Sequence, residues 1–430
     1  MNNLKYIALI TSAIICTHTY AANDDNQSYT RENPTIETGP NQSGSQINYP
    51  SYINLDANHI DMNGADWTSL KQVMSVADSC PVTIVHIGDS HLQADMGTAV
   101  TRDYIGHRFG GLRGRGLIIP FKLAGTNQPV DYTITSTTNM TQSRLLKTPW
   151  PTAMGFTGIG IQPANSQFDL EVSTREPYDA LTVYYSGDSI EVVNVMSDGI
   201  VVPFVAERDN KSVEISLPGQ YTTCDITFKS PAKVAVHGIN ASCGNTGLAY
   251  EVIGNNGATF ATYSGIGNVG HDVANYFMPD LIILSLGTNE AFSTISDAAF
   301  RKTIDDFVKE IKATNPDASL LLTTPQECQR KGITRGRKRR RRRTSFTVNA
   351  NVKRMRDVIV AYGHDNNIPV YDWYAVAGGT GSSAMWVTSH TINTDRIHLT
   401  LAGYRIQGSL MAEALIEALT DNNDSDHHND

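Results

Sequence analysis

Residues 82–93 read VTIVHIGDSHLQ, and this stretch decides the fold. Its first half is an apolar run rich in β-branched residues, which is typical of a strand buried on both faces. A Gly-Asp-Ser turn and a helix-compatible stretch follow. Open α/β sheets assemble their active sites at the carboxyl ends of such strands. Ser90 is therefore predicted to be either a nucleophile or the N-cap of the next helix.

A second Gly-Asp-Ser string, at residues 187–189, shows how weak the three letters are as a signal. It stands between ALTVYY and IEVVNV, two runs with the character of strands. This copy is therefore predicted to be a hairpin turn. The strand–turn–helix setting is what distinguishes Ser90.

The alternation of strands and helices resumes near residue 249. Further strands are predicted at 281–286, 319–323 and 368–371. Apolar residues at helical spacing predict three long helices with the following buried faces: Phe300, Ile304, Phe307, Val308 and Ile311; Val348, Val352, Met355, Ile359 and Tyr362; Ile406, Leu410, Ala414 and Leu415. Strands that alternate with helices form a parallel sheet covered on both faces. The sequence thus predicts a three-layer α/β/α fold.

A different pattern occupies residues 116–242. Short runs with period-two alternation, such as FDLEV and DITF, are separated by turn residues. This pattern predicts an antiparallel β-sandwich. The sandwich is inserted between the first and second strands of the α/β domain, which is therefore split into residues 54–115 and 243–420.

The two ends of the chain have their own signals. Residues 1–21 carry one lysine, an apolar run and Thr-Tyr-Ala, which predicts an export signal too short to span a bilayer. Ile15 stands where a lipobox needs a small residue, so anchoring at Cys16 is not expected. Residues 22–53 are predicted to be a disordered linker and 421–430 an acidic tail. We expect an exported protein, periplasmic or secreted, without an integral membrane segment.

Cysteine and histidine spacing gives no sign of a metal site. After the export signal, four cysteines remain, and Cys224 and Cys243 are near enough in sequence to pair in an oxidising compartment. The spacing alone leaves that pairing open. Because no CxxC or Cys/His ligand cluster occurs, no zinc site and no cofactor are expected.

The formal charge of −9 conceals an asymmetry. Residues 330–343, RKGITRGRKRRRRR, contain ten of the 34 basic residues and no acidic residue. Nucleic-acid binding is not expected, because no aromatic residues are interleaved with the arginines of 335–343. Two interpretations remain: a solvated mobile loop, or a lip beside the active site that gathers a charged glycan or wall polymer.

Asp395 and His398, within DRIHLT, are candidates for the partners of Ser90. A hydroxyl is a poor nucleophile until a base takes its proton, and a neutral imidazole suits that role. The imidazole in turn needs an anion on its other nitrogen. Two residues between Asp395 and His398 allow a tight turn to bring the carboxylate to the ring. The alternative is a polar loop before the last helix.

Gly257 and Asn289 follow two further predicted strands, in IGNNGAT and LSLGTNE. A tetrahedral oxyanion requires preorganised donors. The backbone amides of Ser90 and Gly257 and the side-chain amide of Asn289 could supply three. Each residue alone would more simply be a turn residue.

In order, Ser90, Gly257, Asn289 and His398 resemble the four motif blocks of the SGNH (GDSL-type) hydrolases. The resemblance covers about residues 80–110 and 249–420. It implies a flavodoxin-like hydrolase domain with Ser90 as nucleophile, His398 as base and Asp395 as its orienting acid. Asp89 would then be structural. Glu290 departs from the family, which usually has Asp at that position.

A narrower resemblance is to the peptidoglycan O-acetylesterase branch. It rests on GDSHLQAD at 88–95, the inserted β-module and the later motifs. It implies a carbohydrate-binding-like insert and an acetylated polysaccharide as partner. We therefore expect an exported acetylesterase, most specifically one for peptidoglycan. The alternatives are an esterase for xylan, host glycans or short-chain lipids, and a glycan-binding protein with an inactive hydrolase domain.

Overall fold

The computed structural model describes residues 48–209, 211–335 and 342–420. All of them belong to one compact unit. The predicted export signal, Cys16 and the acidic tail lie outside the described residues. So do most of the predicted linker and the middle of the arginine run.

The expected disorder of the linker is wrong for its last residues. Tyr49 Oη donates to Glu413 Oε1 at 2.6 Å. Ile53 is buried. Aromatic and aliphatic side chains give this short segment enough contact to order it. The folded domain therefore begins before residue 54.

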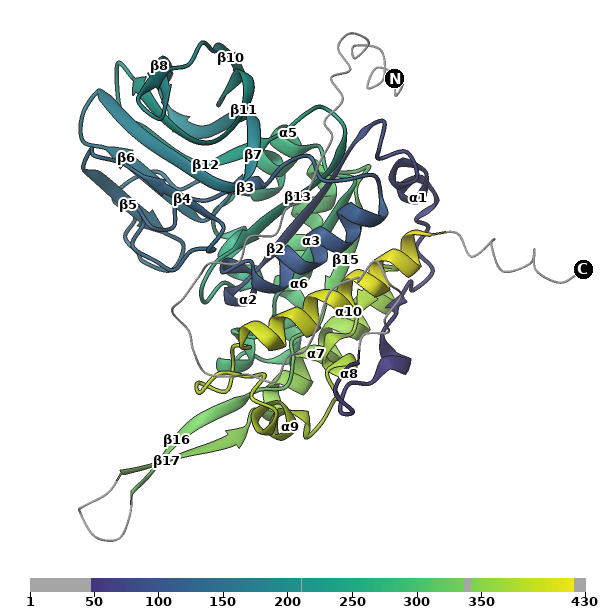
Figure 1. Cartoon of the computed structure of the whole chain (residues 1–430). Helices are drawn as coiled ribbons and strands as arrows, with labels where there is room; N and C mark the ends of the chain where they lie inside the picture. The colour runs from purple at the N-terminus through teal and green to yellow at the C-terminus, as the bar shows by residue number, and fades with distance from the viewer. Residues whose placement is uncertain (1–47, 210, 336–341, 421–430) are drawn as a thin grey trace, which may run out of the picture. The chain divides into compact units, whose positions relative to one another are not determined.

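A six-stranded sheet forms the centre of the α/β domain (Figure 1). Its strands, in spatial order, are β1 (Ile60–Asp61), β18 (Val370–Tyr371), β15 (Ser319–Thr323), β14 (Leu281–Ser285), β2 (Pro81–Gly88) and β13 (Gly247–Gly254). All neighbours are parallel except the β1–β18 pair. Strands that are apolar on both faces are shielded from water only when helices cover both faces of the sheet. The predicted three-layer architecture is confirmed.

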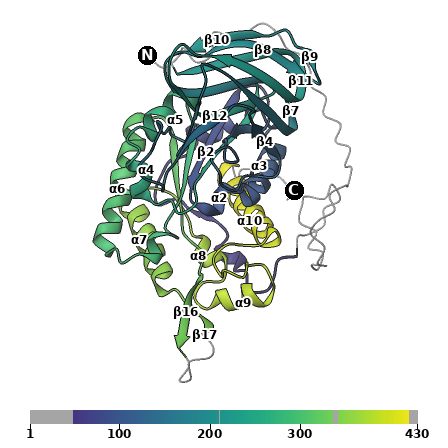
Figure 2. The ribbon, with the colours of Figure 1, turned by 90° about the vertical axis from the view of Figure 1, so that its left-hand side faces the viewer.

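Helices cover the two faces of this sheet (Figure 2). One layer contains α1 (Thr68–Met74), α3 (Met96–Arg108) and α10 (Leu401–Leu419); the other contains α4 (Phe260–Ser264), α5 (Val269–Phe277), α6 (Asp297–Thr314) and α7 (Ala350–Asp365). Short helices complete the domain: η1 (Leu55–Ala57), α2 (Ser90–Gln93), η2 (Glu290–Phe292), α8 (Trp373–Val376) and α9 (Ser382–Thr388). Among the described residues, no helix is long and apolar enough to cross a bilayer.

The predicted helix faces are confirmed with one exception. All of the residues expected in α6 and α10 are buried there. Val348 was expected in α7 but lies in a strand with its side chain exposed. The helix begins later because Asn349 is its N-cap and accepts a hydrogen bond from the Asn351 amide at 3.3 Å.

The inserted module is a single ten-stranded antiparallel sheet. Its strands are β3 (Gly116–Ile118), β4 (Tyr132–Thr135), β5 (Met140–Arg144), β6 (Ile159–Pro163), β7 (Gln167–Gly187), β8 (Glu191–Ser197), β9 (Ile200–Val201), β10 (Val205–Asp209), β11 (Ser212–Lys229) and β12 (Val234–Ser242). The long strands β7 and β11 pair along both of their halves, with a register shift between. Such irregularities bend a sheet so that its halves can enclose a core.

One expectation for this module is wrong, and one question that the sequence left open is answered. The turn at 187–189 joins β7 to β8, but β11 lies between these strands in the sheet, so the turn is not a hairpin. Cys224 is a buried free thiol, so the structure contains no bond between it and Cys243. Contacts between residues far apart in the chain decided both outcomes, and the local sequence patterns do not contain such contacts.

The module covers the edge of the parallel sheet. β13 is the last strand of that sheet, and its Glu251 accepts hydrogen bonds from the Leu117 amide and, at 2.7 Å, from Asn240 Nδ2. Burial raises the pKa of Glu251, and these donors oppose the effect. An uncovered strand edge would be a template for aggregation. The insert therefore completes the α/β domain.

The arginine run is described only at its two ends, and its middle, residues 336–341, lies outside the described residues. Residues on either side of its middle form an antiparallel pair, β16 (Gln329–Arg335) with β17 (Arg342–Val348). This two-stranded sheet, here called the basic hairpin, projects from the α/β domain beyond β15 (Figures 1 and 2).

Candidate active site

The register of the parallel sheet gathers the candidate site at one edge. Gly88 at the end of β2 lies opposite Gly254 of β13 and Ser285 of β14. The segments that follow these strands therefore emerge side by side. They carry Ser90, Gly257 and Asn289, which the sequence placed just after predicted strands.

The turn after β2 orients Ser90. Asp89 is the N-cap of α2, and its Oδ1 accepts a hydrogen bond from the His91 amide at 2.9 Å. Ser90 is the first residue of the helix, so its interpretation as the N-cap is wrong. A Cβ at position 88 would lie 2.7 Å from the Ser285 carbonyl oxygen, so only glycine allows this turn to approach β14.

Ser90, His398 and Asp395 form a continuous hydrogen-bonded chain. His398 Nε2 lies 2.8 Å from Ser90 Oγ, and His398 Nδ1 lies 2.7 Å from Asp395 Oδ2. The other oxygen of Asp395 accepts the backbone amides of Ile397 at 2.9 Å and His398 at 3.0 Å. The tight turn expected from the Asp395–His398 spacing is present.

The charges of this chain are set by its hydrogen bonds. The hydrogen bond that His398 donates to the Asp395 carboxylate raises the pKa of His398 above its ordinary value, although burial opposes this increase. Burial disfavours the Asp395 carboxylate, but its bonds to His398 and to two backbone amides outweigh burial and lower its pKa to about 2. At neutral pH the acid is therefore ionised and the imidazole is poised to gain a proton.

Gly257 and Asn289 line the same cleft as Ser90. Gly257 has a left-handed φ of 81°, which favours glycine. Asn289 Nδ2 donates to the Ala258 carbonyl at 2.9 Å and lies 3.5 Å from Asp89 Oδ2, which is at the limit of a hydrogen bond. These two contacts hold the Asn289 amide in place beside the cleft.

Glu290, the departure from the family pattern, is a buried supporting residue. Its Oε1 accepts the Phe260 amide at 3.0 Å, which attaches η2 to the start of α4. Oε2 has no hydrogen-bond partner within the described structure. Burial raises the pKa of Glu290 to about 7. Glutamate thus performs a structural task here and lies outside the group that faces Ser90.

The cleft around Ser90 has a volume of about 470 Å³ and is lined by four side-chain amides, Asn127, Asn256, Asn289 and Asn393. Amides offer both donors and acceptors, which suits a ligand covered with hydroxyl groups. The lining also includes the apolar side chains of Met96, Phe292, Ile397 and Leu399.

A network of amides connects the inserted module to this cleft. Gln93 Nε2 donates to the backbone oxygen of Asn127 at 2.7 Å and to its Oδ1 at 2.9 Å. Gln93 Oε1 accepts the Asn256 amide at 2.7 Å, and Asn256 Nδ2 donates to Asn127 Oδ1 at 2.6 Å. Among the lining residues, Asn127 alone comes from the inserted region. Sequence reasoning missed it, because no local motif marks it.

The end of the HLQAD string is structural. Asp95 is buried and forms ion pairs with Arg102 at 2.9 Å and Arg115 at 2.6 Å. Arg115 also pairs with Asp131 at 2.6 Å. These bonds attach α3 to the segment that enters the module. They explain why an aspartate closes the string without placing it in the cleft.

His91 supports the triad from the side. Its ring centroid lies 5.2 Å from that of His398, and its Nδ1 lies 3.1 Å from Tyr404 Oη. Burial lowers the pKa of His91. A neutral ring beside His398 adds no repulsion when His398 becomes protonated.

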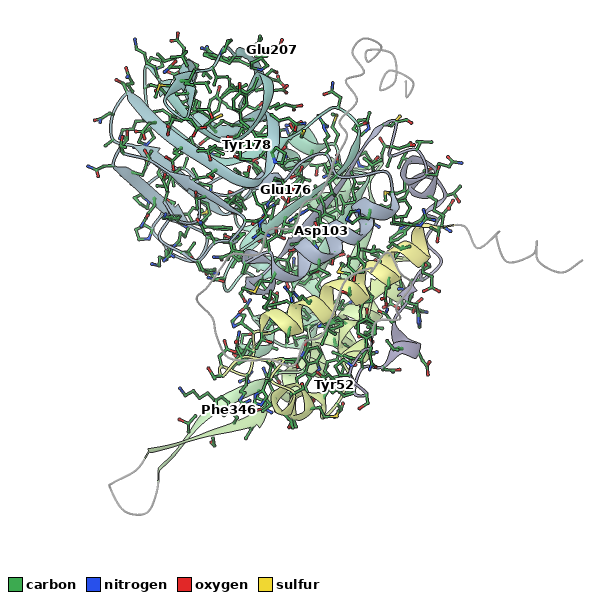
Figure 3. All side chains as sticks on the ribbon, viewed as in Figure 1. Tyr52, Asp103, Glu176, Tyr178, Glu207 and Phe346 are labelled. Carbon is green, nitrogen blue, oxygen red and sulfur yellow. The ribbon has the colours of Figure 1, made fainter. Side chains whose placement is uncertain are left out.

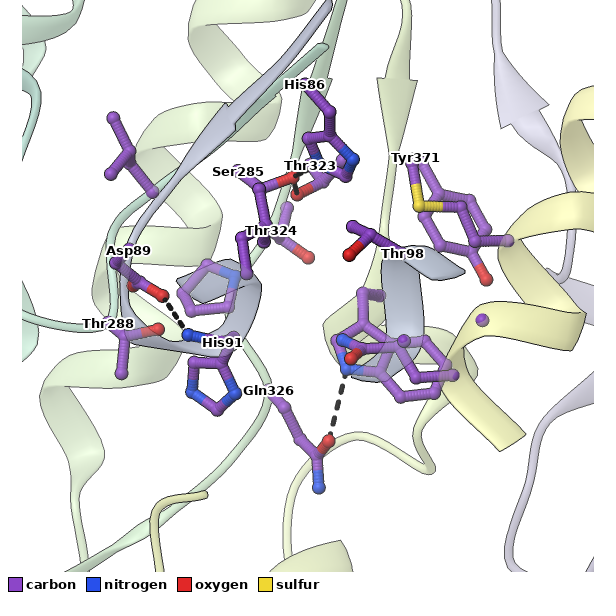
Figure 4. A pocket seen from close by; sticks show the side chains of 18 of the residues that line it. His86, Asp89, His91, Thr98, Ser285, Thr288, Thr323, Thr324, Gln326 and Tyr371 are labelled. Carbon is purple, nitrogen blue, oxygen red and sulfur yellow. Dashed lines mark hydrogen bonds between the residues drawn. The ribbon is translucent and has the colours of Figure 1, made fainter. Parts of the chain in front are cut away.

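A second, small cavity, of about 60 Å³, lies behind the nucleophile turn (Figure 4). His91 and Thr288 border it near the turn, while His86 and Ser285 line it along the strands. Thr288 also lines the cleft. The turn that carries Ser90 therefore lies between the cleft and this cavity, and its hydrogen bonds keep it rigid.

Across residues 48–209, 211–335 and 342–420, no group of three His, Cys, Asp or Glu side chains is arranged to hold a metal ion. The chemistry available to the cleft is that of its own side chains: a hydroxyl, an imidazole, a carboxylate and several N–H donors.

Comparison with known proteins agrees with this geometry. Residues 234–406 match the model of the GDSL-like lipase/acylhydrolase family. This match contains Gly257, Asn289, Asp395 and His398 and begins after Ser90. No curated protein sequence matches the chain.

One solved structure shares the fold, and two others match with lower scores. A structure titled "Peptidoglycan O-acetylesterase in action, 5 min" superposes with a TM-score of 0.66 at 18% identity, over 86% of this chain and 98% of that chain. A lipase/acylhydrolase from Enterococcus faecalis matches at 21% identity over 40% of this chain and 78% of that chain, with a TM-score of 0.30. A family two carbohydrate esterase from Clostridium thermocellum matches at 13% identity over 67% and 99%, with a TM-score of 0.29. The first likeness covers the α/β domain together with its insert.

Proposed function

We propose that this chain, a serine esterase of the GDSL-like lipase/acylhydrolase type, removes O-acetyl groups from a polysaccharide outside the cytoplasm, with peptidoglycan as the first candidate. The observation that carries the proposal is the chain of hydrogen bonds from Ser90 through His398 to Asp395, at 2.8 and 2.7 Å, in a cleft lined by amides.

In the first half of the proposed reaction, Ser90 Oγ attacks the acetyl carbonyl carbon while His398 Nε2 takes the hydroxyl proton. Asp395 stabilises the imidazolium. The oxyanion is held by the amides of Ser90 and Gly257 and the side chain of Asn289. The bond between the carbonyl carbon and the sugar oxygen then breaks, and His398 gives its proton to that oxygen.

In the second half, a water molecule attacks the acetyl group on Ser90. His398 takes the proton of the water, and acetate leaves as Ser90 Oγ regains a proton. Each step uses groups already present in the cleft, and no cofactor takes part.

The polysaccharide assignment is supported by the lining of the cleft. Its four asparagines offer hydrogen bonds to hydroxyl groups, and Met96, Phe292, Ile397 and Leu399 add apolar surface on which a sugar ring can lie. The peptidoglycan assignment is supported by the GDSHLQAD string, by the inserted module and by the likeness to the structure of a peptidoglycan O-acetylesterase. The export signal expected at residues 1–21 would place the enzyme with that polymer.

Acetate release from O-acetylated peptidoglycan, acetylated xylan and aryl esters of acetate and decanoate tests the proposal. The wild-type protein should release acetate from peptidoglycan at a higher kcat/KM than from xylan, and should cleave the acetate ester faster than the decanoate ester. Ser90→Ala should abolish all of these activities. Polymer binding without acetate release by the wild type would favour the glycan-binding alternative. Preference for decanoate would favour a lipid esterase.

A further inference from the structure

We propose that Gln93 is a positioning residue for the loop of residues 254–258, here called the oxyanion loop, and that the inserted module takes part in the reaction through it. The proposal rests on the proposed esterase reaction, in which the Gly257 amide of this loop holds the oxyanion. It adds the residues that fix the direction of that amide.

The oxyanion loop contains a tight turn whose own residues allow more than one shape. The Ala258 amide donates to the Asn255 carbonyl at 3.0 Å, which closes a β-turn with Asn256 and Gly257 at its centre. Gly257 has a φ of 81°, as the third residue of a type II turn does. Glycine accepts a negative φ about as readily, and that change would turn the Gly257 N–H in another direction. Contacts from outside the turn therefore select the direction of this N–H.

Gln93 supplies such a contact from the helix that carries the nucleophile. It is the last residue of α2, which begins at Ser90, and its side chain is buried. Its Oε1 accepts the Asn256 amide, the N–H next to that of Gly257, at 2.7 Å. A Cβ on Gly254 would lie 2.5 Å from the Gln93 backbone nitrogen, so the start of the loop packs directly against α2. One short helix thus holds both the nucleophile and the oxyanion loop.

The inserted module fixes the other end of the Gln93 side chain. Gln93 Nε2 donates to the backbone oxygen of Asn127 at 2.7 Å, to Asn127 Oδ1 at 2.9 Å and to Thr126 Oγ1 at 3.1 Å. Because Oε1 meets an N–H group and Nε2 meets oxygens, this position requires an acceptor and a donor on one side chain. Glutamine meets both requirements, whereas methionine, which has a similar length, meets neither.

The module also contacts the oxyanion loop directly. Asn256 Nδ2 donates to Asn127 Oδ1 at 2.6 Å, and Asn255 Nδ2 donates to the Thr157 carbonyl at 2.8 Å. Asn127 and Thr157 belong to different loops of the module. The oxyanion loop is therefore held between α2 on one side and two loops of the module on the other.

The module can act as a fixed support because it is attached to the α/β domain away from the cleft. Glu251 of β13 accepts hydrogen bonds from Leu117 and Asn240 of the module. Glu176 of β7 and Asp103 of α3 are close enough for their charges to interact, and Figure 3 labels both where the two parts meet. None of these residues lines the cleft. The support for Gln93 is therefore independent of what the cleft binds.

The position of the Gly257 amide matters because oxyanion donors act over a short range. A donor is effective at about 2.7–3.1 Å from the oxyanion, and removing one donor lowers kcat by about 10²- to 10³-fold. Gln93 does not line the cleft, so its effect on the reaction passes through the oxyanion loop.

The test replaces Gln93 by methionine and follows hydrolysis of an aryl acetate. Gln93→Met should lower kcat by at least about tenfold and at most about 10³-fold, the cost of one lost oxyanion donor. The KM should stay within about twofold, because the ground-state ester does not depend on these donors. A kcat within about twofold of the wild type would overturn the proposal.

Gln326→Met is the matched control. Gln326 is 7% exposed against 3% for Gln93, accepts a hydrogen bond from Trp373 Nε1 at 3.1 Å and does not line the cleft. This variant should lower the Tm as Gln93→Met does but keep the wild-type kcat. An equal loss of kcat in the two variants would overturn the positioning role, because any buried glutamine would then have the same effect.

Inhibition by methylboronic acid locates the damage. This acid bonds to a serine oxygen as a tetrahedral anion and so resembles the transition state. Its Ki in Gln93→Met should rise by the same factor by which kcat/KM falls, and the pH dependence set by His398 should not move. An unchanged Ki, or a shifted pH dependence, would overturn the proposal by placing the damage at the triad.

Asn127→Ala tests the same contact from the exposed side, where folding is not at risk. It removes one acceptor of Gln93 Nε2 and should lower kcat for the aryl acetate about fivefold, as expected for one neutral hydrogen bond. Combined with Gln93→Met, it should cause no further loss of kcat, because both residues act through one contact. Losses that multiply in the double variant would overturn the role of the module.

Hydrogen exchange separates this proposal from the proposed function. The Asn256 amide should exchange faster in Gln93→Met than in the wild type or in Gln326→Met, because its acceptor is gone. Equal exchange in the three proteins would overturn the contact. If the exchange differs but the wild type releases no acetate from any ester, the esterase assignment fails and the support of the loop by Gln93 stands.

Discussion

The chain contains Gly-Asp-Ser twice, and the two copies have different fates. At 88–90 the string lies at the end of a buried parallel strand, and Ser90 Oγ is 2.8 Å from His398 Nε2. At 187–189 it joins two strands of the inserted sheet, where Asp188 is exposed and accepts the Ser189 amide at 2.7 Å. The serine of a Gly-Asp-Ser string is a catalytic candidate only where the fold brings a histidine base close to it.

The glycines of the two copies are required for different reasons. A Cβ on Gly187 would lie 2.3 Å from the Lys233 carbonyl oxygen, and its φ of 97° already favours glycine. Gly88 is needed because β14 approaches closely, with the Ser285 carbonyl 2.7 Å from a Cβ at that position. The glycine of each string is thus required by its surroundings. The neighbouring strands decide whether the requirement is a positive φ, a close backbone approach or both.

Replacing the serine of each Gly-Asp-Ser string by alanine should give the largest difference in kcat between the two copies. Ser90→Ala should lower kcat for acetate release by at least about 10⁴-fold, because the nucleophile and its base act as a unit. Ser189→Ala should leave kcat within about twofold, since a substitution far from the site is felt only through stability. Acetate release under saturating substrate measures both. Comparable losses in the two variants would contradict our assignment of Ser90.

Two aspartates near Ser90, Asp395 and Asp89, offer a second test of what distinguishes its surroundings. Asp395→Asn should cost about 10³- to 10⁴-fold in kcat, because the imidazole loses the anion that orients it. Asp89→Asn preserves the N-cap and should cost far less. The pH profile adds a readout. Wild-type activity should fall as pH drops through the raised pKa of His398, and in Asp395→Asn that limb should move to lower pH. A limb that does not move would argue against Asp395 as the partner.

The inserted module contributes one residue, Asn127, to the cleft around Ser90. Asn127→Ala should raise KM for the polymer about tenfold, which corresponds to the loss of one hydrogen bond of about 1.4 kcal/mol. The KM for an aryl acetate should not change. Asn194→Ala in β8, outside the cleft lining, is the matched control. Equal KM values for the polymer would remove Asn127 from the binding surface.

The smallest expected effect concerns Glu290, and it appears in stability. Its pKa of about 7 in the folded protein exceeds the ordinary value of 4.5, so folding binds a proton more tightly. The stability from this proton is complete below pH 4.5 and is lost as pH rises through 7. Glu290→Gln should therefore have a similar Tm at pH 4.5 and a higher Tm at pH 8, where its free energy of unfolding exceeds that of the wild type by a few kcal/mol at most, because each pKa unit is worth about 1.4 kcal/mol. Identical pH dependence of Tm in both proteins would show that Glu290 does not titrate in this way.

Much of the fold could be predicted from local patterns. The strands of the parallel sheet and the buried faces of α6 and α10 follow from apolar periodicity, which burial imposes directly. What could not be predicted has a different origin. The 187–189 turn, which was wrongly predicted as a hairpin, and the state of Cys224, which the sequence left open, depend on contacts between residues far apart in the chain. The ends of elements, such as Val348, depend on capping bonds.

The candidate site divides in the same way. Ser90, Gly257, Asn289, Asp395 and His398 follow from motifs, each just after a strand or before a helix. Asn127 and the bracing role of His91 could not be predicted, because the segments that hold them meet the cleft only through tertiary packing. The basic hairpin was visible as charge, but its contacts with Arg396 and Phe292 were not.

The sequence by itself determined the chemistry: a serine, a histidine and an aspartate at positions that a parallel α/β sheet brings to one edge, and a concentration of arginine after its fourth strand. Only the tertiary structure decided which Gly-Asp-Ser string receives a base, which residue of the insert enters the cleft and where the arginines are attached. The physical reason is range. Periodicity and turn preferences act over a few residues, whereas a hydrogen bond from residue 90 to residue 398 exists only after the whole sheet has formed.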